Sequence, residues 1–228
     1  MLRRTLLTAS FSILAAAPLM AQDKPDMKGE KKMDHMDMDH KVKGGPLPEG
    51  WHGRTDEKSA KIDDAKFVTM GKGFHVTSGP AAIYWNEMDK ARVPFTASAT
   101  LSQRKAPSHP EAYGLFFGGK NLDEASQTYF YFLVRGDGKF LVNHRAGLAV
   151  HKIVEWTESA AIKKADEKGA ASNTLTVDAG KDSVRLKVNG TQVAALSAKD
   201  VAGNGEIIGL RVNHNLDVHI GDFIVTKK

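Results

Sequence analysis

The most constraining feature of this sequence is a strict alternation of apolar and hydroxyl-bearing residues between Pro94 and Ser102. The apolar positions are Phe95, Ala97, Ala99 and Leu101, and the hydroxyl positions are Thr96, Ser98, Thr100 and Ser102. Because successive side chains of a strand point to opposite faces, this pattern predicts a strand with one buried face. A strand of this kind needs a second layer over its apolar side, which favours two sheets packed together.

Short segments of strand character continue from Trp51 to the end of the chain. Thr128–Arg135 reads TYFYFLVR, a dense apolar run typical of a central strand covered on both faces. The other expected strands are Gly73–Thr77, Ala81–Trp85, Ala112–Gly118, Phe140–His144, Thr174–Ala179, Val184–Val188, Gln192–Leu196, Gly205–Asn213 and Asp217–Thr226. Roughly ten to twelve strands at this spacing predict an all-β antiparallel sandwich.

Glycine-bearing turns mark two hairpins and one irregularity. Gly136-Asp137-Gly138 and Asn189-Gly190 each separate two expected strands, and both supply the positive φ angles that tight hairpin turns need. In the last strand the apolar positions change phase near Gly221, which predicts a β-bulge.

The first 21 residues have the order of a secretory signal peptide. Arg3 and Arg4 precede an apolar stretch, and Ala21 stands before the polar Gln22. We therefore expect cleavage near Ala21 and export to the periplasm or the extracellular space. The apolar stretch is too short to span a membrane, and no later segment of the sequence is long enough.

Residues 22–48 form a polar segment with one Val, one Leu and no aromatic residue, which predicts a disordered linker before a domain at 49–228. The chain has no cysteine, so disulfides, thiolate zinc sites and cysteine nucleophiles are excluded. Removal of the leader takes away two arginines and lowers the formal net charge from +5 to about +3. A charge this small, without a cluster of Lys and Arg, argues against a nucleic-acid partner.

Three segments resemble a known superfamily. They are AYGLFFGG (Ala112–Gly119), TYFYFLVRGDGKFLVNHR (Thr128–Arg145) and GEIIGLRVNHNLDVHIGDFIV (Gly205–Val225). Together they resemble the concanavalin A-like/LamG jelly-roll proteins, and most of all secreted bacterial proteins with the domain of unknown function 1080, also called the 3-keto-disaccharide hydrolase domain. The resemblance implies a two-sheet jelly roll with a saccharide-related role. No catalytic residue of the hydrolase family and no LamG calcium site can be matched to this sequence.

The linker contains a run of potential metal ligands. They are Met33, His35, Met36, Met38 and His40, with aspartates between them. Thioether and imidazole groups suit Cu(I) or Ag(I), so the run could form a labile copper or silver site on a flexible chain. The alternative is a solvated spacer that binds nothing.

Two sets of residues within the domain could bind a ligand. The first contains Tyr84, Trp85, Asn86, His144, Arg145 and Trp156, because aromatic faces and fixed polar groups suit a saccharide on the concave sheet of a jelly roll. The alternative is that both tryptophans pack in the core or at a sheet edge.

The second set contains Arg211, Asn213, His214, Asn215 and His219. By alternation we expect Arg211, Asn213 and His219 to share the face opposite the apolar residues of LRVNHNLDVHI. This set could supply metal ligands or an acid–base pair, or could only hydrogen-bond around a turn.

Hydrolysis of a glycoside needs two carboxylates at a fixed separation. The candidates by position are Glu111, Glu155, Glu158, Asp217 and Asp222, and their spacing selects no pair. The sequence therefore favours a secreted or periplasmic saccharide-binding module over an enzyme. A hydrolase or lyase acting on 3-keto glycosides and a copper- or silver-binding protein are the alternatives.

Overall fold

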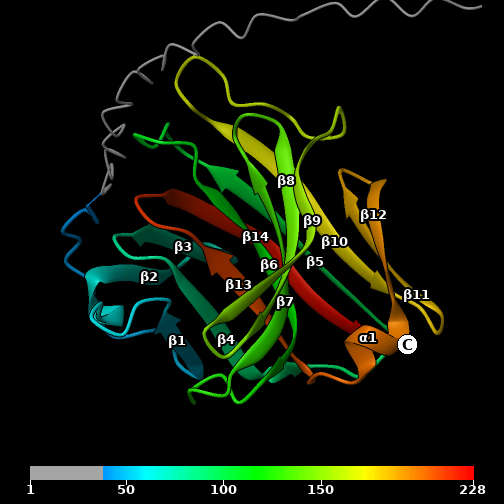
Figure 1. Cartoon of the computed structure of the whole chain (residues 1–228). Coiled ribbons are helices and arrows are strands. Elements are labelled where there is room, and N and C mark those ends of the chain that lie inside the picture. The colour runs from blue at the N-terminus through cyan, green and yellow to red at the C-terminus, as the bar shows by residue number, and fades with distance from the viewer. Residues whose placement is uncertain (1–37) are drawn as a thin grey trace, which may run out of the picture. The chain divides into compact units, whose positions relative to one another are not determined.

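The computed structural model describes residues 38–228, so the predicted signal peptide and the predicted linker residues 22–37 lie outside the described residues. The described chain forms two antiparallel sheets of seven strands each (Figure 1). Sheet A contains, in spatial order, β1 (Trp51–Thr55), β4 (Ala82–Lys90), β13 (Ile207–Val212), β6 (Ala112–Lys120), β7 (Thr128–Arg135), β8 (Lys139–Ala146) and β9 (Ala149–Glu158). Sheet B contains β12 (Thr191–Ser197), β11 (Ser183–Val188), β10 (Ala171–Ala179), β5 (Phe95–Gln103), β14 (Asp217–Lys227), β3 (Gly73–Ser78) and β2 (Ala65–Met70).

The all-β sandwich predicted from the sequence is confirmed. Strand β5 alternates strictly between buried and half-buried residues, with its apolar side chains in the core. Its hydroxyl side chains face away from sheet A and pair with the neighbouring strand β10: Thr100 and Thr174 oxygens lie 3.0 Å apart, and Ser102 and Ser172 oxygens 2.8 Å apart. Hydrophobic burial on one face and hydroxyl pairing on the other thus both favour the observed register.

The predicted turns and the predicted bulge are also confirmed. Gly138 has a φ of 89°, and Asn189 and Gly190 have φ angles of 50° and 83°. The pairing of β14 with β5 shifts register between Gly221 and Ile224, where Asp222 takes a φ of 51°. These positions are ones where an L-residue other than Asn, Asp or Gly would be strained.

Three strands were not predicted: β1, β2 and β9. Strand β9 is the edge of sheet A, nearly all of its residues are exposed, and two register shifts interrupt its pairing with β8. Its sequence therefore lacks the period of two that a half-buried strand shows. A 3₁₀ turn at Ile62–Asp64 and one short helix, α1 (Ala198–Ala202), connect strands. Within residues 38–228 no helix is long and apolar enough to cross a membrane.

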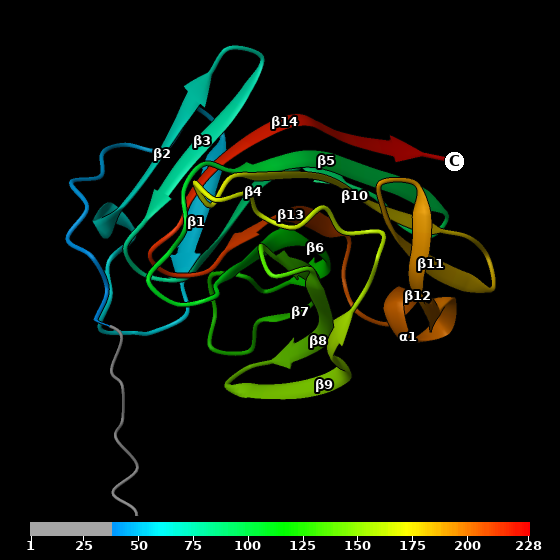
Figure 2. The same cartoon turned by 90° about the horizontal axis from the view of Figure 1, so that it is seen from above.

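The main core lies between the sheets, and a second apolar cluster covers the outer face of sheet A, the face directed away from sheet B. This second cluster contains Ile83, Trp85, Ala112, Phe116, Leu122, Tyr129, Tyr131, Leu133 and Leu141. Figure 2 shows sheet A bending so that this outer face lies on the inside of the curve. Part of the concave face of the sandwich is therefore apolar and buried.

The last part of the predicted linker contacts the domain. The His40 amide donates a hydrogen bond to Asn215 Oδ1 at 2.7 Å, and the Gly44 amide donates one to the Asp63 carbonyl at 2.9 Å. Leu47 packs against the main core. Contacts with the domain are therefore present from residue 38, the first described residue, which is before the boundary at 48–49 that composition indicates.

Candidate functional site

The outer face of sheet A brings together two of the residues singled out from the sequence, Arg145 and Arg211. Alternation places both on this face. Leu210 and its ladder partner Tyr84 point into the core, so Arg211, the next residue of β13, points outward. Arg145 is paired with Tyr129 of β7, which belongs to the outer cluster. The two guanidinium groups meet at one carboxylate, that of Asp56, in the turn after β1.

The Asp56–Arg211 contact is two-pronged. Arg211 Nη1 donates to Asp56 Oδ1 at 2.8 Å, and Nη2 donates to Oδ2 at 2.6 Å. Arg145 Nη1 lies 3.6 Å from the same Oδ2, and Arg145 Nε donates to the Gly147 carbonyl at 3.1 Å. The bidentate geometry fixes the plane of the carboxylate and leaves Arg145 as its second, longer ion-pair partner.

We call these three residues the Asp56 cluster (Asp56, Arg145 and Arg211), and their charges determine the protonation state of Asp56. Burial alone would raise the pKa of Asp56, but Arg211, Arg145 and Arg54 together hold the pKa of that carboxyl below its usual value. Asp56 is therefore a carboxylate at neutral pH, and the two guanidiniums of the cluster outnumber it. Burial would lower the pKa of Arg211, but Asp56 holds it above the usual range.

Tyrosine side chains and an amide surround the Asp56 cluster. The Arg211 guanidinium lies over the Tyr131 ring, 4.7 Å from its centroid, and Arg211 Nη1 lies 3.3 Å from the Tyr129 hydroxyl oxygen. Asn143 Nδ2 donates to the Tyr131 hydroxyl at 3.0 Å. The face thus presents planar polar groups held in place by aromatic rings, a combination that suits hydroxyl-rich ligands.

One loop folds over part of this face. Arg54 of β1 donates from Nη1 to the Leu122 carbonyl at 2.7 Å and to the Glu124 carbonyl at 2.5 Å. The Gly147 amide donates to the Gln127 carbonyl at 2.7 Å, which ties the other end of the loop to the turn after β8. Residues 121–127 therefore form a cover anchored at both ends, with Leu122 inserted in the apolar cluster.

Trp156 lies at the other end of the same face. It is 40% exposed on the edge strand β9, and the Arg135 guanidinium lies 4.2 Å from its ring centroid. Arg135 is held in turn by a side-chain contact with Asp137. An exposed indole steadied by a cation is an available stacking surface.

Tyr84 and Trp85 are not available to a ligand as the structure stands, which corrects the expectation that both belong to a binding surface. Tyr84 points into the main core and is fully buried, and burial raises its hydroxyl pKa. Trp85 lies on the outer face but is covered, with the His52 ring stacked on it at 5.5 Å. Their neighbour Asn86 accepts a hydrogen bond from the Met88 amide.

His144 lies on the inward-facing side of β8, near one end of the sandwich. Its ring stacks on Phe130 at 4.4 Å, and its Nε2 lies 2.9 Å from Thr128 Oγ1 and 3.2 Å from Asn204 Nδ2. Burial lowers the pKa of His144, although the Asn204 contact opposes this. His144 and Arg145 therefore face opposite sides of the sheet and cannot contact the same ligand group.

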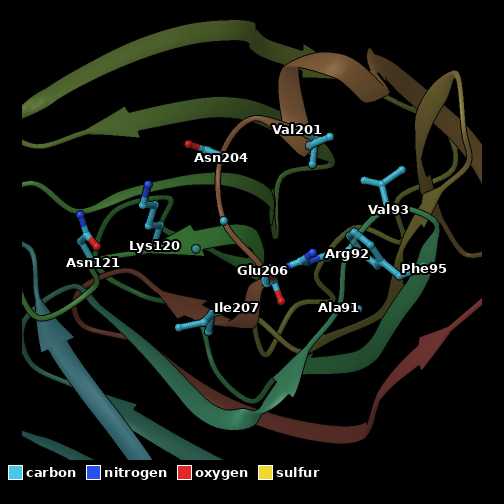
Figure 3. Close-up of a pocket in the computed structure, with 13 residues that line it drawn as sticks. Ala91, Arg92, Val93, Phe95, Lys120, Asn121, Val201, Asn204, Glu206 and Ile207 are labelled. Atoms are coloured by element: carbon cyan, nitrogen blue, oxygen red, sulfur yellow. The ribbon is translucent and has the colours of Figure 1, made fainter.

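A cavity of about 630 Å³ opens beside Asn204 at this end of the sandwich (Figure 3). Arg92 Nε and Glu206 Oε1 form a 2.6 Å ion pair across it, and both side chains are at least 40% exposed. Apolar groups line one side, including Val93, Phe95 and Val201. Because its one ion pair is exposed and its lining is mixed, this cavity indicates no particular ligand chemistry.

The expectation that Arg211, Asn213 and His219 share a face is wrong. Residues 213–216 form the turn that carries the chain from sheet A to sheet B, so alternation does not continue from β13 to β14. Asn213 Nδ2 donates to Glu111 Oε2 at 3.2 Å, and His214 Nε2 lies 2.8 Å from Glu111 Oε1. His219 lies on the outer face of sheet B, and Asn215 binds the backbone of residues 38 and 40.

The five carboxylates considered from the sequence are dispersed over the domain. Glu155 pairs with Lys152, Glu158 with Lys164, Glu111 with His214 and Asp217 with His75, while Asp222 lies at the bulge of β14. None of the five is among the groups that shift the pKa of Asp56.

The predicted metal ligands of the linker are mostly untested. Met33, His35 and Met36 lie outside the described residues, Met38 is exposed, and His40 contacts Asn215 through its backbone. Within residues 38–228 no group of three or more histidine or acidic side chains is arranged to hold a metal ion.

Sequence reasoning did not find Asp56, Tyr129, Tyr131 or Asn143. Asp56 lies in the polar stretch TDEKS, outside the segments that carry the family resemblance. The alternation of TYFYFLVR does place Tyr129 and Tyr131 on one face and Phe130 and Phe132 on the other, so this signal was available. Nothing in the sequence indicates that Asp56 meets Arg211, because 155 residues separate them.

The sequence matches no protein-family model and no curated protein. Among solved structures, the chain is similar to the carbohydrate-binding module CBM66 from Bacillus subtilis, with a TM-score of 0.56, 12% identity and coverage of 78% of this chain and 95% of that one. It is similar to a glycoside hydrolase family 16 protein from Bacteroides ovatus (TM-score 0.53, 7% identity, coverage 78% and 96%). It is also similar to a protein of unknown function with a galectin-like fold from Bacillus subtilis (TM-score 0.51, 12% identity, coverage 77% and 88%). These similarities confirm a jelly-roll fold of the galectin and concanavalin kind.

Proposed function

We propose that this protein is a saccharide-binding module that acts in the periplasm or outside the cell, with its ligand on the outer face of sheet A. The observation that carries the proposal is the Asp56 cluster, in which two guanidiniums and one carboxylate from distant parts of the chain meet on the concave face. The similar folds of a carbohydrate-binding module and a glycoside hydrolase support a saccharide ligand.

The polar groups of this face suit the hydroxyls of a sugar. Asp56 accepts, the arginines donate, and the Asn143 amide offers both a donor and an acceptor. The side chain of Asp56 is 21% exposed and the side chain of Arg145 is 10% exposed, so both retain some contact with solvent. Trp156 offers an aromatic face to the apolar side of a sugar ring.

Binding is favoured over hydrolysis by the state of Asp56. A general acid for glycoside cleavage needs a raised pKa, whereas the arginines hold the pKa of Asp56 below its usual value. A carboxylate locked by two hydrogen bonds from Arg211 is also poorly placed to act as a nucleophile.

Binding is tested by isothermal titration of the purified protein with saccharides chosen from a glycan array. Trp156→Ala removes the exposed indole of β9, and Arg145→Gln alters the Asp56 cluster. Loss of stacking or of one charged hydrogen bond should weaken binding about tenfold. Met88→Ala is the control, because Met88 is 83% exposed on β4.

The proposal fails if no saccharide binds, or if the Met88→Ala control loses as much affinity as Arg145→Gln and Trp156→Ala. Near-ultraviolet circular dichroism of each variant shows whether the fold is kept. A loss of binding with an unchanged spectrum supports a direct role of the replaced residue.

A second candidate is an enzyme acting on 3-keto glycosides, favoured by the three segments that resemble the 3-keto-disaccharide hydrolase domain family, Ala112–Gly119, Thr128–Arg145 and Gly205–Val225. Incubation of the protein with a 3-keto disaccharide, followed by chromatography of the products, tests it. A progress curve that stays flat at high protein concentration removes this candidate.

A further inference from the structure

A cavity of about 710 Å³ lies on the outer face of sheet B, on the opposite side of the sandwich from the Asp56 cluster. The turn of the β2–β3 hairpin forms one wall, and the residues that follow β5 form another. Its lining residues are Met70, Gly71, Lys72, His75, Arg104, Lys105, Asp217 and His219. Three permanent cations and two imidazoles therefore face a single carboxylate.

The two histidines are direct neighbours across strands β3 and β14. His75 and His219 are paired in the register, and their ring centroids lie 6.3 Å apart. His75 Nε2 lies 3.0 Å from Asp217 Oδ1. The Nδ1 atoms of both rings are buried and have no hydrogen-bond partner among the described residues.

The lone carboxylate is already shared. Asp217 contacts His75 at 3.0 Å and Lys105 Nζ at 3.9 Å, while no ion pair of Lys72 or Arg104 is found within residues 38–228. The positive charge of Lys66 on β2 also lowers the pKa of His75. The cavity consequently has an excess of positive charge, which favours a ligand that carries negative charge.

We propose that this cavity is a second binding site, which takes an oxyanion group: a sulfate, a phosphate or the carboxylate of an acidic sugar. Lys72, Arg104 and Lys105 supply charge, and His219 supplies a ring nitrogen at the floor. The site is independent of the saccharide face of sheet A, because it is built from different strands on the opposite sheet.

Protonation of His75 should accompany binding. Burial lowers the pKa of His75, Asp217 raises it, and His219, Arg104 and Lys66 lower it further. His75 is therefore mostly uncharged at neutral pH, and an anion bound beside it favours the protonated ring. By linkage the anion should bind more tightly as the pH falls from 8 to 5.5.

The test is isothermal titration of the full chain with sodium sulfate, sodium phosphate and glucuronate, at constant ionic strength and at pH 8.0, 7.0 and 5.5. Glucose is the uncharged comparison ligand. The three anions distinguish a free inorganic ion from an acidic sugar. We expect at least one anion to bind, with about tenfold higher affinity at pH 5.5 than at pH 8.0.

Variants separate this site from general surface charge. Lys72→Gln and the double change Arg104→Gln/Lys105→Gln should each weaken anion binding about tenfold, and His75→Gln should reduce its pH dependence. Lys181→Gln/Arg185→Gln removes two positive charges at β11 and the turn before it, three strands away from β14 in the same sheet, and should leave binding unchanged.

Three results would overturn the proposal. They are the absence of binding by all three anions, an equal loss in the Lys181→Gln/Arg185→Gln control, and an affinity that does not change with pH. Because Lys72 is exposed on a hairpin turn, Lys72→Gln should fold even if the double variant does not. Binding of glucose alone would point to the saccharide face and would also count against an oxyanion site.

Discussion

The Asp56 carboxylate and the Arg211 guanidinium are joined by two parallel hydrogen bonds of 2.8 and 2.6 Å, although 155 residues separate them in the chain. Arg211 is nearly inaccessible to solvent, so its charge depends on Asp56 for compensation. The pair connects the turn after β1 with the centre of sheet A. The geometry of the concave face and the stability of the domain are therefore linked at this contact.

Asp56→Ala should destabilise the protein by about 3 kcal/mol, because it leaves the buried Arg211 charge without a partner. Arg211→Met should cost a similar amount. The double variant should be less destabilised than the two single effects added together, because removing both charges leaves neither unpaired. Urea denaturation of all four proteins measures this coupling. Strictly additive effects would show that the two residues do not depend on each other.

Arg54→Ala should loosen the loop at residues 121–127, because Arg54 Nη1 binds the carbonyls of Leu122 and Glu124. Hydrogen bonds from a charged donor are each worth about 1.5–3 kcal/mol, so local opening should become at least about tenfold more frequent. Hydrogen–deuterium exchange of the Glu124 and Gln127 amides, which bind within the loop, reports this opening. Arg92→Ala is the control, since Arg92 lies on an exposed ion pair elsewhere. Unchanged exchange in Arg54→Ala would mean that Arg54 does not hold the loop.

Gly209→Ala should destabilise the protein by about 2–3 kcal/mol. A Cβ at this position would lie 2.3 Å from the Tyr84 carbonyl oxygen and 2.5 Å from Phe116 Cε1, so the Phe116 ring uses the space that glycine leaves. Thermal or urea unfolding measures the cost. Gly221→Ala is a matched control in another strand, because its Cβ would lie 4.0 Å from the nearest atom, and its effect should stay within about 0.5 kcal/mol. Equal effects of the two changes would rule out the steric explanation.

Much of the fold was predictable because strands with one buried face record their orientation in alternation. Phe95 to Gln103 shows this alternation. The hairpin turn was predictable for another reason, because Asn189 and Gly190 are residue types that accept positive φ angles. The edge strand β9 was missed because it buries little on either side and carries two register shifts. A segment without a buried face leaves no period in its sequence.

The candidate site was only partly predictable. Alternation correctly puts Arg211 on the face opposite Leu210, but it cannot tell that the turn at 213–216 moves His219 to the other sheet. It also cannot tell that the His52 ring stacks on Trp85 on the outward face, or that Asp56 reaches Arg211. Contacts between distant segments depend on strand order, which single-sequence patterns do not contain.

The acid stability of the protein should depend on Asp178 in β10. Its carboxylate accepts hydrogen bonds from Lys187 Nζ at 2.9 Å and from Lys228 Nζ at 2.5 Å, and these lower the pKa of Asp178 to about 2. The unfolded chain has a pKa of about 3.9 at this residue. The depressed pKa therefore contributes stability that is complete above about pH 4 and is lost as the pH falls towards 2.

Asp178→Asn should remove this contribution. Because Lys228 is 42% exposed, solvent screens the pair, and we expect a loss of about 1 kcal/mol at pH 7. At pH 2 most of this difference should be gone, since Asp178 is then about half protonated in the folded protein and almost fully protonated in the unfolded chain. Urea denaturation at pH 7, 4, 3 and 2 gives the two curves. Asp182→Asn, in the exposed turn between β10 and β11, is the control. Curves for Asp178→Asn and the unmodified protein that stay parallel down to pH 2 would show that Lys187 and Lys228 do not stabilise the charged form of Asp178.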